Sequence, residues 1–171
     1  MKKTARGFTL VELLVVIAII AILAAVVVLI INPLELMRRS RDAARLTDLA
    51  NLQTAINVAV QESTSSSSNM ACNADPNPCP DNSVDGARTV DGNGWVHVNF
   101  SNQKSVTVPT LPIDPVNNPT YHYTYCGSGD DWLIKTVLES EQQAQKMQTD
   151  GIDDGYYQVG SDMTLNDSCT Y

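Results

Sequence analysis

The decisive stretch reads Lys2-Lys3-Thr4-Ala5-Arg6-Gly7-Phe8-Thr9-Leu10-Val11-Glu12 and continues as an unbroken apolar run over residues 13–31. Three cations precede the glycine, and a single carboxylate, Glu12, stands four residues beyond Phe8. The run that follows is long and apolar enough to suit lipid. The chain is organised around this stretch, and its isolated acid needs a physical explanation.

Glu12 needs a partner if it enters a membrane. A charged side chain in hydrocarbon costs at least about 2.5–3.5 kcal/mol on insertion scales, so an acid there points to function. No basic residue lies between Phe8 and Ile31. The one cation available at this depth is an α-amino group, which cleavage after Gly7 would create on Phe8. We therefore expect Glu12 to pair with such an amine.

The run Arg6-Gly7-Phe8-Thr9-Leu10-Val11-Glu12 resembles the class III signal of type IV pilins and type II secretion pseudopilins. In that family a membrane peptidase cuts after the glycine and methylates the new phenylalanine amine. The resemblance implies cleavage between Gly7 and Phe8, N-methylation of Phe8, and a role for Glu12 in assembly. It covers residues 1–62 closely and the remainder loosely.

Two simpler interpretations explain less. An ordinary secretory signal also joins a positive leader to an apolar run, but here the run is too long and no Ala-x-Ala cleavage site follows it. A plain membrane anchor fits the length, because the 22 residues from Leu10 to Ile31 would span about 33 Å as a helix. It leaves Gly7, Phe8 and Glu12 unexplained.

The formal net charge is -8, and removing the leader with its three cations leaves -11. Beyond residue 62, four basic residues face fourteen acids. Such an acidic surface repels phosphate backbones, so we expect no direct binding of nucleic acid.

Four cysteines, Cys72, Cys79, Cys126 and Cys169, all follow the apolar run. An even number in a polar region indicates disulfides formed outside the cytoplasm, although spacing alone leaves three connectivities open. A local Cys72–Cys79 loop would staple a proline-rich segment, and Cys126 with Cys169 resembles the pair that closes the C-terminal region of many type IV pilins. We expect a single pass through the inner membrane with the head outside, followed by an extracellular pilus or a periplasmic pseudopilus.

Four segments are predicted along the chain. Residues 1–7 form a cleaved leader, residues 8–31 a transmembrane and filament-core helix, residues 32–62 an amphipathic continuation, and residues 63–171 a soluble pilin-like head. Pro33 should kink the helix, because proline removes a backbone donor and clashes with the preceding turn.

The continuation shows helical periodicity. Its apolar stripe should cover a sheet, and it consists of Leu49, Leu52, Ile56, Ala59 and Val60. The charged residues of the same segment are expected to face solvent or neighbouring subunits, and they include Arg38, Arg41, Asp42, Arg45 and Asp48.

The head reads as an antiparallel sheet of three to five strands, which gives an α+β, type IV pilin-like fold with a long N-terminal helix packed on the sheet. Alternation and β-prone composition predict strands at residues 95–100, 105–108, 121–125, 132–138 and 156–159. Residues 139–148 suit a short helix or a polar loop. Prolines in residues 72–80 exclude a helix or an inner strand there.

The stretch Leu111-Pro112-Ile113-Asp114-Pro115 resembles the proline-bounded loop before the sheet of major pseudopilins and of many Gram-positive-type pilins. Val116-Asn117 departs from the pseudopilin pattern, which often has Trp-Gly at this point. This departure favours a pilus subunit over a secretion pseudopilin.

An acidic loop near the C-terminus is a candidate cation site. It places Asp150, Asp153 and Asp154 among glycines, and calcium takes six to eight oxygen ligands. The EF-hand order is absent, but major pseudopilins carry calcium in a comparable late loop. The chain is expected to work without a cofactor, with calcium as the one candidate and a solvated acidic turn as the alternative.

Catalytic motifs are missing from the sequence, so we expect no enzyme. His97 and His122 each lie in a strand-like alternation, and no nucleophile elbow, phosphate-binding glycine loop or paired helical histidine motif occurs.

The resemblance instead implies a structural subunit, a pilin, of a type IV pilus-like filament. Its partners would be copies of itself in a helical homopolymer, the prepilin peptidase and methyltransferase, the membrane, and the inner-membrane assembly platform with its motor. Two alternatives stay open: a major pseudopilin of a type II secretion system, and a minor pilin that binds a surface ligand.

Overall fold

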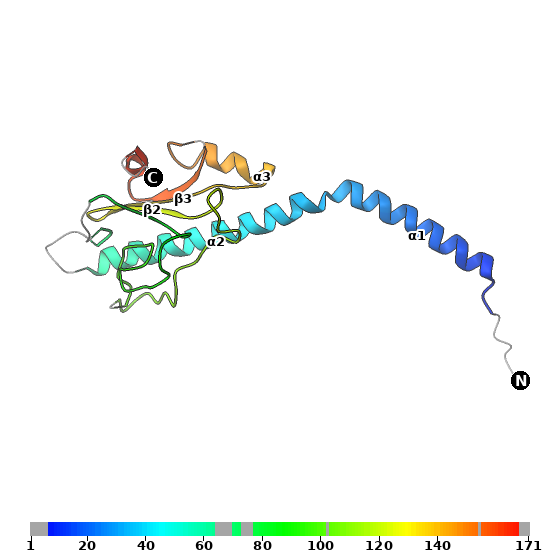
Figure 1. Ribbon diagram of the computed structural model, residues 1–171, viewed down its shortest axis with the longest axis horizontal. Helices are drawn as coiled ribbons and strands as arrows, with labels where there is room; N and C mark the ends of the chain where they lie inside the picture. Colours follow the sequence, from blue (N-terminus) through cyan, green and yellow to red (C-terminus); the bar gives the residue numbers. More distant parts are fainter. Residues whose placement is uncertain (1–6, 64–69, 73–76, 102, 154, 168–171) are drawn as a thin grey trace, which may run out of the picture. The chain divides into compact units, whose positions relative to one another are not determined.

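A computed structural model describes residues 7–63, 70–72, 77–101, 103–153 and 155–167. The chain forms two compact units, Met1–Met37 and Arg38–Tyr171 (Figure 1). The leader cations, most of the serine-rich segment (residues 63–69), Asp154 and Cys169 lie outside the described residues.

Helix α1, Leu10–Ile31, begins with a capping box. The Thr9 hydroxyl accepts a hydrogen bond from the Glu12 backbone N–H at 3.2 Å, and the Glu12 carboxylate accepts one from the Thr9 N–H at 2.9 Å. The helix ends at Asn32, whose φ of 43° lies in the left-handed region that terminates helices. Pro33 follows as the first residue of α2, Pro33–Glu62, where its missing N–H costs nothing.

The second unit contains a four-stranded antiparallel sheet in the order β1-β2-β3-β4. The strands are β1 Cys79–Asn82, β2 Thr124–Ser128, β3 Asp131–Thr136 and β4 Tyr157–Gly160. Helix α3, Glu141–Ala144, and the short 3-10 helix η1, Gln145–Gln148, connect β3 to β4, and η2, Met163–Asp167, follows β4. The α+β, pilin-like architecture is confirmed.

The core of this unit lies between α2 and the sheet, which run alongside each other (Figure 1). Leu49, Leu52, Ile56 and Ala59 are buried as the helical stripe predicted, and Val60 is partly buried. They pack with aromatic and aliphatic side chains of three strands and of the segment before β2, which include Tyr123, Tyr125, Trp132, Ile134 and Val159. Removing this apolar surface from water is the main force that holds the head together.

The prediction that the charged residues of α2 face outward is wrong for two of them. Asp42 and Arg45 are completely buried, because Arg45 meets Asp114 and Asp42 meets the backbone of Glu139 and Ser140. These partners lie 69 to 98 residues further along the chain. Periodicity on one helix carries no information about them.

The strands predicted at residues 95–100 and 105–108 are also wrong. Residues 91 and 99 form only an isolated bridge, and both segments are irregular. The chain turns tightly here, since a Cβ on Gly94 would lie 2.1 Å from the Thr89 carbonyl oxygen. The alternation therefore does not separate two faces, and Trp95, Val96, Val98 and Phe100 all enter the same core.

The remaining strands agree with prediction except at their ends. The strand predicted at residues 121–125 begins at Thr124, whereas β3 and β4 fall within the predicted ranges to one or two residues. Strand β1 was not predicted, because its sequence is Cys79-Pro80-Asp81-Asn82. It lies at the edge of the sheet, where proline is tolerated.

Candidate functional site

The N-terminal junction is open in the structure. Phe8 is 80 % exposed, and a Cβ built on Gly7 would meet nothing within 4 Å. Beyond the junction, the Thr9 hydroxyl donates to Glu12 Oε2 at 2.7 Å, so the carboxylate is held at the first turn of α1. Sequence around Gly7 and Phe8 is thus accessible, and the acid has a defined position relative to both.

The surface of α1 is apolar on every side. None of its 22 residues is buried within the chain. Among the described residues, α1 is the one helix long and apolar enough to span a membrane. A helix that is hydrophobic all round is normally found in a membrane or inside a larger assembly.

Comparison with known proteins identifies this segment. Residues 2–28 match the family model described as the prokaryotic N-terminal methylation motif. This match supports a likeness of the N-terminal segment to type IV pilins and pseudopilins. No curated protein and no solved structure matches the chain. The motif points to a structural component rather than to an enzyme.

The second unit contains a buried charge network around Arg45. Its Nε and Nη2 donate to the two Asp114 oxygens at 2.6 and 2.9 Å, and its Nη1 donates to Asp42 at 2.7 Å. The same Nη1 lies 2.7 Å from Glu139, and the guanidinium stacks 5.2 Å from the Tyr121 ring centre. Burial alone would lower the pKa of Arg45, but these hydrogen bonds raise it, so the cation is retained. We name these residues the Arg45 network.

Asp114 holds the proline-bounded loop in place through hydrogen bonds. Besides Arg45, its Oδ1 accepts backbone N–H groups of Val116 and Asn117 at 2.8 and 3.2 Å. Asn117 adopts a φ of 47° and exchanges hydrogen bonds with Ser83. The loop is thereby attached both to α2 and to the segment after β1.

Glu139 makes the network sensitive to acid. A hydrogen bond from Arg41 lowers the pKa of Glu139, burial opposes this, and Arg45 adds to the lowering. A carboxyl whose pKa in the folded state lies below its ordinary value of about 4.3 stabilises the fold above that pH. This contribution to stability is lost as the pH falls through the lowered pKa.

We expect the thermal midpoint to fall between pH 6 and pH 3, and to fall less in Glu139→Gln. Circular dichroism measures both, with the exposed Glu141→Gln as control; an unchanged pH profile in Glu139→Gln would contradict this role.

The cysteines that the structure describes, Cys72, Cys79 and Cys126, are all disulfide-bonded. Cys72 and Cys79 are bonded, with Cα atoms 5.8 Å apart, and attach the segment before β1 to the sheet edge. Cys126 is disulfide-bonded as well. Cys169, its expected partner, lies outside the described residues, so that connectivity stays a prediction.

The acidic loop does not gather its carboxylates in the described part of the chain. Asp150 accepts a hydrogen bond from the Gln158 backbone, and Asp153 accepts one from Gly155 at 3.0 Å. No group of three or more acidic, histidine or cysteine side chains suited to a metal occurs among the described residues. Asp154 lies outside them. Calcium binding here remains a prediction of the sequence.

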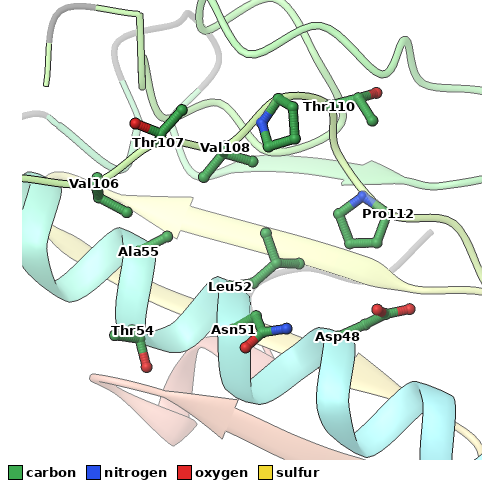
Figure 2. Close-up of a pocket in the computed structure, with 11 residues that line it drawn as sticks. Asp48, Asn51, Leu52, Thr54, Ala55, Val106, Thr107, Val108, Thr110 and Pro112 are labelled. Carbon is green, nitrogen blue, oxygen red and sulfur yellow. The ribbon is translucent and has the colours of Figure 1, made fainter.

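A groove of about 420 Å³ runs between α2 and residues 106–112 (Figure 2). Leu52 and Ala55 contribute apolar surface from the helix, and Val106, Val108 and Pro112 face them from the loop. Of its described lining residues, Asp48 is the ionisable one, and it accepts a hydrogen bond from the Tyr123 hydroxyl at 2.9 Å. Burial raises the pKa of Asp48 although this hydrogen bond lowers it. The groove provides no acid–base pair.

The two histidines lie in structural positions. His97 Nε2 is 3.5 Å from Asp81 Oδ2, and His122 Nδ1 is 3.1 Å from the Asn118 carbonyl oxygen. Sequence analysis missed the residues that organise the head, Arg45 and Asp114. A buried arginine opposite a proline-bounded Asp could have been suspected only from the Leu-Pro-x-Asp-Pro motif.

Proposed function

We propose that the chain is processed after Gly7, methylated on Phe8, and assembled through α1 as a structural subunit of a type IV pilus-like filament. The observation that carries the proposal is α1 itself. It presents apolar side chains in every direction, buries none of them within the chain, and begins three residues after Gly7.

Lipid and a bundle of identical helices can each bury this apolar surface away from water. The membrane holds the subunit before assembly, with a single pass and the head outside the cytoplasm. The Cys72–Cys79 disulfide supports that side, because such bonds persist in oxidising compartments. The prepilin peptidase, an assembly platform and its motor would then transfer α1 from lipid into the filament core.

Glu12 gives the assembly its register. It stands in the first turn of an otherwise apolar helix, four residues after Phe8. In the low dielectric of a helix bundle, its attraction to the Phe8 amine of a neighbouring copy favours one axial position, and each unpaired charge penalises the others. The capping bonds from Thr9 satisfy the carboxylate before that partner arrives.

A Gly7→Val variant tests the processing step. Because a Cβ at this position meets nothing within 4 Å, we expect no effect on the fold and a loss of cleavage. Intact-mass spectrometry of the membrane fraction should show the full-length chain, whereas the wild type should begin at Phe8. A Gly7→Ala variant, the smallest change, is the matched control. A shortened Gly7→Val product would contradict the assigned cleavage site.

A pilus is favoured over a secretion pseudopilus by the serine-rich segment, by the disulfide loop before β1 and by Val116-Asn117. The pseudopilin alternative is supported by the similarity of Leu111–Pro115 to the proline-bounded loop of major pseudopilins. Shearing whole cells separates the two: a pilus subunit enters the sheared extracellular fraction, while a pseudopilin stays in the envelope and its deletion blocks protein export. A minor pilin would be a small share of the sheared filament protein.

A further inference from the structure

The loop after η1 closes in a way that differs from a calcium loop. A calcium site directs carboxylate and carbonyl oxygens inward, onto the ion. Here two successive backbone N–H groups point inward instead. Those of Ile152 and Asp153 both donate to the side-chain oxygen of Gln158, at 2.9 and 3.2 Å. Two backbone donors therefore face the centre of the loop, and both bind a neutral amide oxygen.

Gln158 is held firmly in this position. It lies on β4 and is 2 % exposed, and its own backbone N–H donates to the Asp150 carboxylate. Gly151 packs directly against the amide, because a Cβ there would lie 2.0 Å from the Gln158 side-chain oxygen. One of the two Asp150 carboxylate oxygens, Oδ2, already binds the start of β4.

A cation of the chain's own stands beside the loop. Lys135 pairs with Gln158 across β3 and β4, so both side chains leave the same face of the sheet. The Lys135 ammonium donates to the Asn166 side-chain oxygen at 2.7 Å, and the Asn166 amide donates to Asp153 Oδ2 at 3.4 Å. Its nitrogen also lies 4.8 Å from the Tyr156 ring centre. An ammonium, an amide and a carboxylate thus form a chain from β3 to the loop.

The charges around this ammonium have the sign that a bound metal would need. Burial lowers the pKa of Lys135, whereas the negative charges of Asp153 and Asp167 raise it. The pKa of Lys135 is lowered overall, and the acids of the loop and of η2 offset part of the effect of burial.

We propose that the Gln158 amide and the Lys135 ammonium close this loop in place of a calcium ion. The inward N–H groups, the bond from the Gln158 N–H to Asp150 Oδ2 and the Lys135–Asn166–Asp153 chain favour this closure over a metal site. The head then folds and stays folded without calcium. This inference does not depend on which filament the subunit builds.

Calcium addition tests the proposal on the processed full chain in detergent micelles. Thermal unfolding is followed by tryptophan fluorescence, since Trp95 and Trp132 are buried. We expect about 5 mM calcium, above the roughly 0.1–1 mM range of weak extracellular sites, to change the wild-type midpoint by less than about 1 °C relative to EGTA. A rise of more than about 3 °C that magnesium does not reproduce, and that Asp153→Asn abolishes, would overturn the proposal.

A second measurement tests the lysine itself. In EGTA, Lys135→Met should lower the midpoint by about 3–6 °C, while the same change at the exposed Lys146 should not. Asp153→Asn should lower the midpoint in the wild type but not in the Lys135→Met background, a coupling that lost packing of the lysine stem does not produce. Equal effects of Asp153→Asn in both backgrounds would overturn the role of Lys135.

Discussion

Replacing Glu12 by valine is expected to lower the yield of assembled filament at least about tenfold, while the processed subunit stays in the membrane. Valine removes the one charge from α1, so insertion into lipid becomes easier. The same change leaves the Phe8 amine of each neighbouring copy without its counter-charge inside the bundle. Electron microscopy and immunoblotting of the sheared fraction measure the yield, and membrane fractionation measures insertion.

Two further variants separate charge from shape at this position. Glu12→Gln keeps the length of the side chain and the capping bond to the Thr9 backbone, and it should still lose assembly. Glu141→Gln makes the same exchange at an exposed site in α3 and should have no effect. Wild-type filament yield from Glu12→Gln would show that the carboxylate charge does not guide assembly.

The largest loss of stability is expected from Arg45→Met. This change leaves Asp42, Asp114 and Glu139 around a site without its cation, and removing one partner of a buried ion pair costs about 3–5 kcal/mol. We expect the thermal midpoint of the head to fall by on the order of 10 °C. Tryptophan fluorescence of the full chain in detergent micelles measures it.

The exposed Arg39 provides the matched control, because Arg39→Met removes the same atoms from the same helix. Its midpoint should stay within about 1–2 °C of the wild type. A lysine at position 45 should not restore stability, since an ammonium cannot reproduce the two-pronged contact with Asp114. An Arg45→Met midpoint equal to the wild type would contradict the network's structural role.

Local patterns in the sequence were sufficient for the helices. The apolar run over residues 13–31 predicts α1 by its length, and the spacing of Leu49, Leu52 and Ile56 predicts the buried face of α2. Strands β3 and β4 follow from their apolar and aromatic composition, because β3 lies inside the sheet and β4, at its edge, still contributes Val159 to the core.

Long-range contacts decide the rest. Arg45 looked solvent-exposed because its partners lie on loops that only the fold brings close. The alternation at residues 95–100 predicted a strand that the structure does not form. The Trp95 N–H donates to the Ala87 carbonyl and the Phe100 N–H to the Val90 carbonyl, within an irregular segment rather than between paired strands. A short edge strand containing Pro80 has no local signal.

The candidate sites divide in the same way. Gly7, Phe8 and Glu12 form a continuous motif, so the sequence alone indicates them, and the family match covers them. The sequence indicates Asp150 and Asp153 as candidate ligands because they lie in one acidic loop. The groups that close this loop, Gln158 and Lys135, come from two neighbouring strands. The pairing of β3 with β4 brings these two side chains to the loop, and the register of that pairing cannot be read from a single sequence.

Intact-mass spectrometry of the subunit from sheared filaments tests the central claim most directly. The account predicts that the filaments consist of a chain that begins at Phe8 and carries one N-terminal methyl group. Filaments without this chain, or filaments built from a chain that retains Met1–Gly7, would contradict it.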